Sequence, residues 1–241
     1  MSRTFLRLLA LLMTIGLFAA ACGGGDDSGG DDDGGSDEST TTTTEAEEEP
    51  EETTTTTTEV PEDDRDDAIG DFGDSVEDDL GDIPADTTTY GEYVTVTDDS
   101  GVLSVEVPAA WDDVDGGEGL FGPDIIASTD VQAWIQTYEP SGLEFQATGI
   151  ETNQSTDEIL SAVSQGQAGQ CTSLGRQPYS DPLYTGVSEV FQDCGGTETD
   201  FAWVAFEPAD QSYHGVIGVQ ITQQADVEAL ERALATFIVN V

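Results

Sequence analysis

The only histidine of the chain, His214, is the first candidate for acid–base chemistry. A histidine acts as a general base when a serine or cysteine nucleophile lies within hydrogen-bond reach. In the string Tyr213-His214-Gly215-Val216 the histidine opens a predicted strand, and it has no obvious Ser or Cys partner. We therefore interpret His214 as a side chain at a strand edge and expect no catalytic role for it.

Pairs of adjacent acids are the second candidate, because two carboxyl groups flank the bond that most glycosidases cleave. Asp98-Asp99 and Asp112-Asp113 are such pairs, but the chain holds 51 acidic residues, so pairs arise by chance and are read as solvated loops. The Gly-x-Ser-x-Gly elbow, the His-Glu-x-x-His helix and the phosphate-binding glycine loop are absent from the sequence. We expect no catalytic residues; the enzymatic alternative is a hydrolase built from scattered Asp, Ser and His214.

Metal and cofactor chemistry has equally little support in the sequence. His214 and two distant cysteines form too small a ligand set for a structural zinc site. The acidic stretch 26–38 lacks the Asp-x-Asp-x-Asp-Gly spacing of a calcium loop. We expect it to bind divalent cations only loosely. We expect no cofactor and no metal site.

The first 21 residues are typical of an export signal. Arg3 and Arg7 give a positive start, and residues 8–21 form an apolar stretch that closes in small residues. This stretch is shorter than the roughly 20 residues that span a bilayer as a permanent helix. The sequence therefore predicts an exported protein from which residues 1–21 are removed.

The signal ends in residues 17–22, LFAAAC, which resemble the bacterial lipobox. The resemblance implies that Cys22 receives a diacylglycerol, with palmitate among the expected acyl chains, and becomes the mature N-terminus. The protein would then be anchored by lipid on the extracytoplasmic face of the cell membrane. Ala19 departs from the Leu or Val that lipoboxes more often carry there, so ordinary cleavage into a secreted protein is the alternative.

If Cys22 carries lipid, Cys171 and Cys194 form an even pair in an oxidising compartment. A disulfide is the expected state of such a pair. It would contribute roughly 3 kcal/mol to stability on the chain-entropy model. The Cys-x-x-Cys spacing of redox enzymes is absent, so the bond is predicted to be structural.

The net charge of −46 excludes several partners. Nucleic-acid binding needs cationic side chains that displace counterions from phosphates, and the chain has five basic residues in all. Adsorption to anionic lipid is disfavoured for the same reason. We expect no nucleic-acid partner, a membrane contact through the lipid anchor, and a protein or a cell-envelope component as the ligand of the domain.

Composition separates a linker from a domain. Residues 22–64 contain Gly/Asp blocks, threonine runs and acidic patches with almost no large apolar residue, so they are predicted to be disordered. The threonine runs 40–44 and 53–58 are candidate sites of O-glycosylation, and a plain solvated spacer is the alternative.

Residues 65–89 are interpreted as an acidic linker with a marginal helix. Gly70 and Gly73 argue against a stable helix. Three interpretations of this segment remain open: unstructured filler, a docking segment, or a brace against the domain. Four apolar residues are spaced to share one helix face: Ile69, Phe72, Val76 and Leu80.

Residues 90–241 are predicted to form one globular domain. Apolar alternation and turn residues predict a hairpin of strands 92–97 and 102–107. Further predicted strands cover residues 125–127, 131–138, 183–194, 201–206 and 213–222.

Two helices are predicted between these strands. Ser155 and Glu158 have the spacing of a capping box, and a second helix begins at a capping Asp226 and ends near Phe237. Strands with helices inserted at irregular intervals favour an α+β fold, with an antiparallel β-sheet sandwiched with helices.

Four motifs of this domain carry a family resemblance: residues 105–111 (VEVPAAW), residues 125–130, and the cysteine segments 171–186 and 190–196. They resemble a domain of actinobacterial extracytoplasmic lipoproteins, also found beside serine-protease domains, that is similar to the Mog1/PsbP-like fold. The resemblance implies an α+β sandwich and no active site that could be carried over.

These observations predict a membrane-tethered lipoprotein whose C-terminal domain is a non-enzymatic binding or accessory module. A cell-envelope hydrolase is one alternative. The other is a small-molecule-binding protein with a pocket near Trp111 and Trp134, although buried tryptophans are more often core residues.

Overall fold

The computed structural model describes residues 62–81, 83, 89–149 and 154–240. The predicted signal, Cys22 and the linker up to residue 61, with both threonine runs, lie outside the described residues. Among the helices that are described, none is long and apolar enough to cross a membrane.

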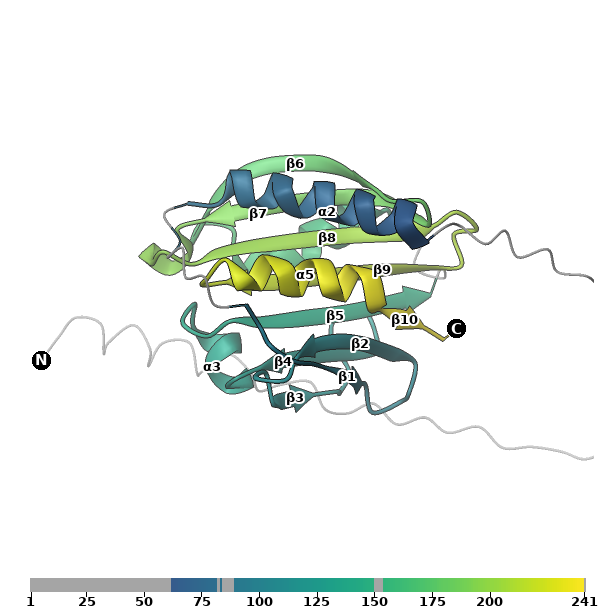
Figure 1. Ribbon diagram of the computed structural model, residues 1–241, viewed down its shortest axis with the longest axis horizontal. Helices are drawn as coiled ribbons and strands as arrows, with labels where there is room; N and C mark the ends of the chain where they lie inside the picture. The colour runs from purple at the N-terminus through teal and green to yellow at the C-terminus, as the bar shows by residue number, and fades with distance from the viewer. Residues whose placement is uncertain (1–61, 82, 84–88, 150–153, 241) are drawn as a thin grey trace, which may run out of the picture. The chain divides into compact units, whose positions relative to one another are not determined.

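A seven-stranded sheet forms the centre of the described fold (Figure 1). Its strand order is β3-β4-β5-β9-β8-β7-β6, and each neighbouring pair is antiparallel. The strands are β3 (Asp113–Asp115), β4 (Asp124–Ser128), β5 (Gly142–Gly149), β6 (Thr172–Ser180), β7 (Tyr184–Gln192), β8 (Asp200–Pro208) and β9 (Tyr213–Ile221).

A second, three-stranded antiparallel sheet lies against the large sheet. It consists of β1 (Tyr93–Thr97), β2 (Leu103–Pro108) and β10 (Ile238–Val239), in the order β1-β2-β10. It contacts β4 and β5 of the large sheet through its strand β2. The predicted hairpin is confirmed, because Val96 of β1 pairs with Val105 of β2 in antiparallel register.

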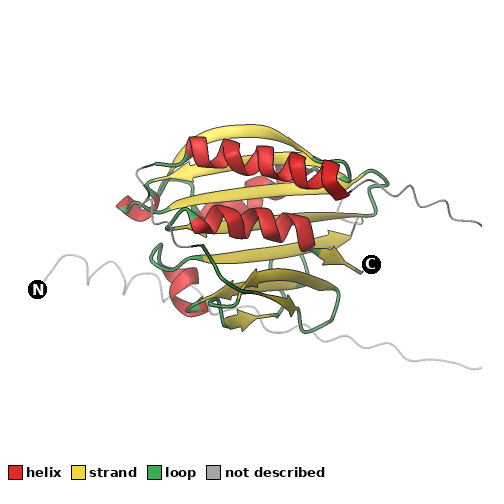
Figure 2. Cartoon of the chain, in the orientation of Figure 1, coloured by secondary structure: helices red, strands yellow, loops and turns green. Residues whose placement is uncertain are grey.

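Helices cover both faces of the large sheet, so the predicted antiparallel α+β class is confirmed. Helices α2 (Glu62–Asp79) and α5 (Ala225–Thr236) lie side by side over one face (Figure 2). Helices α3 (Val131–Gln136) and α4 (Thr156–Val163) pack on the other face through Trp134, Ile159 and Leu160. A 3₁₀ turn, Ser164–Gly166, continues α4.

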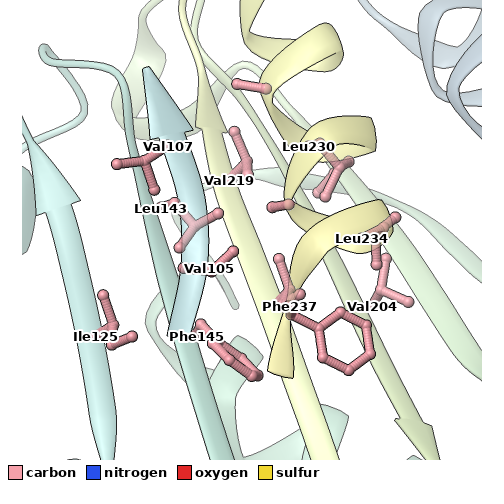
Figure 3. Close-up of a cluster of buried hydrophobic side chains, with 14 of the residues drawn as sticks. Val105, Val107, Ile125, Leu143, Phe145, Val204, Val219, Leu230, Leu234 and Phe237 are labelled. Carbon is pink, nitrogen blue, oxygen red and sulfur yellow. The ribbon is translucent and has the colours of Figure 1, made fainter. Parts of the chain in front are cut away.

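Strand alternation separates two hydrophobic cores. In β5, Leu143 and Phe145 point into the core under α5, while Glu144 and Gln146 point to the opposite face. Figure 3 shows the first core, where Phe237 packs against side chains from β2, β5 and α5. The second core contains Trp134, Phe201 and Trp203.

One predicted strand is wrong. Residues 131–138 form α3 and not a strand, because the Asp130 side chain accepts a hydrogen bond from the Ala133 N–H at 2.9 Å and caps the helix. This local cap overrides the strand preference of the Val131 and Ile135 side chains. The correction moves Trp134 from the sheet to a helix that lies over it.

The helix starts show one confirmed and one corrected prediction. The capping box is present: the Glu158 N–H donates to Ser155 Oγ, and Glu158 Oε2 accepts from the Ser155 N–H at 2.9 Å. Asp226 does not cap α5 as predicted, since the helix begins at Ala225. Its carboxylate instead accepts the Thr222 N–H at 2.8 Å and orders the turn before the helix.

The segment interpreted as a marginal helix is α2, and it packs on the domain. Ile69 and Val76 are buried, and Phe72 lies edge-on to Tyr179 at a centroid distance of 5.2 Å. Gly73 faces α5 so closely that a Cβ there would overlap the Glu231 carboxylate. The glycine that argued against a helix is therefore what lets the two helices approach, and the packed residues begin before Tyr90, in α2.

The predicted disulfide between Cys171 and Cys194 is present. It joins the residue before β6 to the turn after β7, and the Gly195 N–H donates to the Gln170 carbonyl beside it. The bond therefore fixes the outer hairpin of the sheet next to the turn that follows α4.

Candidate functional site

His214 opens a strand, as predicted, since it is the second residue of β9. It lies on β9, an inner strand of the large sheet, and is buried. Its Nε2 lies 3.0 Å from Glu207 Oε2, and its Nδ1 is buried without a hydrogen-bond partner among the described residues. A cavity of about 390 Å³ beside this pair is also lined by Ser155 and Thr156.

The His214 cavity holds no assembled nucleophile. Ser155 Oγ lies 3.2 Å from Glu158 Oε2 and caps α4, so this hydroxyl is engaged in holding the helix start. Glu207 Oε1 accepts from the Gln211 side-chain amide at 3.1 Å. The arrangement resembles a structural hydrogen-bond cluster more than a catalytic triad.

The adjacent acids have structural roles in the structure. Asp98, read as a solvated loop residue, is buried and accepts the Leu103 N–H at 2.5 Å. Burial opposes ionisation of this carboxyl, but hydrogen bonds from Ser100 and Leu103 outweigh it and lower its pKa. Asp113 accepts the Val131 N–H at 2.8 Å next to α3. Asp99 and Asp112 are exposed, as predicted.

Trp111 and Trp134 do not share a pocket, contrary to the alternative considered from the sequence. Trp111 lies in the first core and donates from Nε1 to Tyr90 Oη at 3.2 Å. Trp134 lies on the opposite face of the sheet and lines a cavity of about 400 Å³. The site expected near both tryptophans therefore involves only Trp134.

This cavity, called the Trp134 cavity below, opens between α3, the end of α4 and the large sheet. It combines aromatic rings with a few polar groups. Its lining includes Trp134, Tyr138, Glu144, Gln167, Phe201 and Trp203.

The aromatic wall is built by residues that are distant in the sequence. Trp134 lies against Gly142, where a Cβ would come within 2.6 Å of the indole Cδ1, so the glycine is needed to seat the ring. The Trp134 and Phe201 centroids are 6.1 Å apart, and Phe201 stacks on Trp203 at 4.9 Å.

Two polar groups of the wall differ in their hydrogen bonding. Trp203 Nε1 donates to Gln167 Oε1 at 3.3 Å. Trp134 Nε1 is buried and has no partner among the residues that the structure describes. An unpaired buried donor is unfavourable. The Trp134 N–H is therefore a donor that stays buried and unpaired within the described residues.

Glu144 is the only acid that lines the Trp134 cavity. Burial raises its pKa to about 7, although the hydrogen bond from the Gln146 side-chain amide acts in the opposite direction. At neutral pH this carboxyl is therefore close to half protonated. A carboxyl of this kind responds strongly to any charge brought near it.

A second carboxyl, Asp124 on β4, lies next to Glu144. The loop before β4 covers it at Gly119, where a Cβ would be 2.7 Å from Asp124 Oδ2. Burial, together with the charges of Glu144 and Asp115, raises the pKa of Asp124 to about 8. Its Oδ1 is buried without a partner within the described part of the chain.

The arginines that the structure describes all lie elsewhere. Arg176 pairs with Asp157 at 2.7 Å, Arg232 pairs with Glu106 at 2.5 Å, and Arg65 lies at the end of α5. In the described residues, no group of three or more His, Cys, Asp and Glu has the arrangement of a metal site. Within the described residues, Glu144 therefore lines a cavity that has no protein cation, and Asp124 lies beside Glu144.

The raised pKa of Asp124 predicts a pH dependence of stability. The folded state holds the proton more tightly than the unfolded chain, whose aspartates titrate near 4. The stabilisation is therefore fully present below pH 4 and is lost as pH rises through about 8. We expect Asp124→Asn to flatten the fall in unfolding free energy between pH 5.5 and 8.5, measured by urea unfolding.

The matched control is Glu92→Gln, which removes an exposed acid before β1. It should leave the slope of unfolding free energy against pH unchanged. An equal slope in wild type and Asp124→Asn would show that Asp124 is not the group that titrates.

The sequence predicts a pocket near Trp134 only as an alternative, and it gives no more than a weak signal for the other lining residues. The segment 142–149 alternates apolar and polar side chains, a pattern that normally indicates a face exposed to water. Here the polar side chains Glu144 and Gln146 lie under α3 and the loop at Gly119. Only the helical state of residues 131–136 places Trp134 above them.

The sequence matches no protein-family model and no curated protein.

Proposed function

We propose that this protein is an exported lipoprotein, anchored through lipid on Cys22, whose domain is a non-enzymatic binding module. The observation that carries the binding role is the Trp134 cavity. Its volume of about 400 Å³ falls in the range of small-molecule sites, which are concave, largely aromatic and supplied with few polar groups. The ligand is a small molecule or a protruding group of a cell-envelope component.

The finer fold and family assignment belongs to the same proposal. The motifs at residues 105–111 and 171–196 resemble actinobacterial lipoprotein domains with a Mog1/PsbP-like fold. An antiparallel sheet with helices on both faces is consistent with that sandwich. The family resemblance supports a binding or accessory role because it brings no active site with it.

The binding role is tested with a variant that fills the cavity. Val163 lines the Trp134 cavity from α4, and Val163→Trp should occupy its volume. We expect ligand-observed NMR of a small-molecule library to give hits on the wild type that disappear with Val163→Trp. The control Val114→Trp, on the exposed strand β3, should keep them.

Two outcomes would contradict the binding role. Hits that survive Val163→Trp bind outside the cavity. A library without hits, repeated with a native-membrane extract as the ligand source, would leave the cavity without the proposed function.

A hydrolase is the second candidate, because the His214–Glu207 pair lies in a cavity with the hydroxyls of Ser155 and Thr156. The engagement of Ser155 with Glu158 favours the binding role over this one. A broad hydrolase screen decides between them: activity that is lost on His214→Ala would overturn the non-enzymatic proposal.

The anchor is tested by Cys22→Ser. We expect this variant, once residues 1–21 are removed, to leave the membrane fraction, because lipid on Cys22 is the proposed membrane contact, and to appear in the soluble fraction of the medium or cell envelope. Membrane fractionation with immunodetection measures it. A Cys22→Ser protein that stays with the membrane would contradict the lipid assignment.

A further inference from the structure

We propose that the Trp134 cavity selects organic cations, meaning ligands that present a quaternary ammonium or another basic group. This inference rests on the proposed binding function and specifies the chemical class of the ligand.

The charge of the cavity lining favours a cationic ligand. Among the residues that the structure describes, Glu144 is the only carboxyl of the cavity wall, and no basic residue lines it. The described arginines are held at Asp157, Glu106 and the end of α5, and His214 pairs with Glu207. A positive charge for Glu144 must therefore come with the ligand.

The aromatic wall of the cavity also favours a cationic ligand. Trp134, Phe201 and Trp203 form a continuous aromatic surface, with centroid distances of 6.1 and 4.9 Å between neighbours. The negative face of an aromatic ring attracts a cation, most strongly for tryptophan and where water is excluded. Tyr138 at the rim adds a fourth ring.

The acidic surroundings of Glu144 also favour a cation. Asp124 lies beside Glu144, and the charges of Glu144 and Asp115 both raise the pKa of Asp124. A cation in the cavity would favour the charged form of Glu144, and its binding would release protons near neutral pH.

The long-range field of the protein acts in the same direction. The net charge of −46 attracts small cations and repels anions before contact. Anionic ligands are further disfavoured because Glu144 would face them directly. Neutral ligands also gain from contact with the aromatic rings, so they are the main competitors that the experiment must separate.

The test uses choline and its neutral isostere 3,3-dimethylbutan-1-ol as probes, with affinities measured by NMR titration. The two probes share their shape, and only choline carries a charge. We expect choline to bind the wild type at least tenfold more tightly than the alcohol. Glu144→Gln should weaken choline binding about tenfold and leave the affinity of the alcohol unchanged.

Two controls accompany this comparison. Glu92→Gln removes an exposed acid outside the cavity and should leave choline affinity unchanged. The alcohol titration on Glu144→Gln reports whether the aromatic wall is intact in that variant. Choline affinity should also increase from pH 6 to pH 8 in the wild type and lose this dependence in Glu144→Gln.

The outcomes separate this inference from the proposed function. If the alcohol binds as tightly as choline, or if Glu144→Gln leaves choline affinity unchanged, the cation selectivity is overturned while binding in the cavity stands. Absence of choline binding at millimolar concentration also overturns it. The proposed binding function fails only through the Val163→Trp comparison, which does not depend on ligand charge.

Discussion

Replacing Arg65 by alanine is expected to release helix α2 from the domain. Arg65 is the only basic residue of α2, and its guanidinium donates to the carbonyls of Leu234 at 2.6 Å and Ala235 at 3.1 Å. These are carbonyls of the last turn of α5, which its own helical bonds leave free. Arg65 thus ties the two helices together at one end.

The surroundings of Arg65 increase the expected effect. Its guanidinium lies over the rings of Tyr184 and Phe237, at 5.5 and 5.6 Å. Its Nε is 3.7 Å from Asp181 Oδ2, an ion pair beyond hydrogen-bond distance, and the Asp181 side chain is fully buried. Removing one partner of such a pair leaves the other charge unpaired and destabilises by about 3 kcal/mol or more.

The loss should be confined to α2, because the helix can detach while the large sheet remains folded. Hydrogen–deuterium exchange with mass spectrometry measures it. We expect protection in residues 62–79 to fall by about 3 kcal/mol in the opening free energy, with most of the change in the first half of the helix. The second half stays tied, since Gln192 Nε2 donates to the Asp79 carbonyl at 2.7 Å.

The carboxylates between the two helices give this prediction a pH dependence. Burial, together with the charges of Glu77 and Asp74 of α2 and Glu228 of α5, raises the pKa of Glu231 on α5 to about 7. Docking therefore weakens as pH rises through 7, so protection of residues 62–79 should be lower at pH 8 than at pH 5.5 in the wild type and in Arg65→Ala alike.

A matched control separates the anchor from a general loss of positive charge. Arg176→Ala removes a partly exposed arginine that pairs with Asp157 on the far face of the sheet. Partly exposed pairs contribute less than about 1 kcal/mol, so exchange in α2 should not change. Unchanged protection of α2 in Arg65→Ala would contradict the anchoring role.

The second large effect is expected from Phe237→Ala, which should destabilise the whole domain by about 3–5 kcal/mol. Phe237 is buried and contacts three further rings, with centroid distances of 4.6 Å to Phe206, 4.9 Å to Tyr184 and 5.6 Å to Phe145, the last of which is labelled in Figure 3. These rings come from three different strands, so the neighbours cannot close the space that the ring leaves.

Urea unfolding followed by far-UV circular dichroism measures this loss. The neighbouring residue provides the control: Ile238 is 53% exposed, and Ile238→Ala should cost less than 1 kcal/mol. A Phe237→Ala domain as stable as the Ile238→Ala domain would show that the aromatic cluster is not a main source of stability.

The two sites should also be coupled, because the Arg65 guanidinium lies over the Phe237 ring. In a double-mutant cycle, the combined effect of Arg65→Ala and Phe237→Ala should be smaller than the sum of the single effects. Additive effects would show that α2 docks independently of the ring cluster.

Several elements could be predicted from the sequence because local patterns determine them. The hairpin 92–107 and the strands 201–206 and 213–222 follow from the alternation of apolar side chains and from turn residues. The capping box at Ser155 depends on residues three positions apart and is present. The disulfide needed only the cysteine count and the inferred compartment.

Where two local signals compete, or where a partner is distant, the prediction fails. Residues 131–138 carry strand-forming side chains, but the Asp130 cap turns them into a helix. Gly73 lowers helix propensity, but it is the position at which α2 approaches Glu231. Both signals of the first conflict lie in the local sequence. The second depends on Glu231 of α5, which is distant in the sequence and comes close to Gly73 only in the folded domain.

The sequence by itself determines the antiparallel α+β class, the cysteine pair, the negative charge and most strand positions, since these depend on composition and short-range periodicity. Only the tertiary structure decides that Trp134, Glu144 and Trp203 line one cavity. They belong to α3, β5 and β8, and the strand order β5-β9-β8 brings them together across more than 60 residues of chain. Long-range pairing of this kind leaves no local pattern, because each side chain has the same neighbours in sequence whichever strand it pairs with.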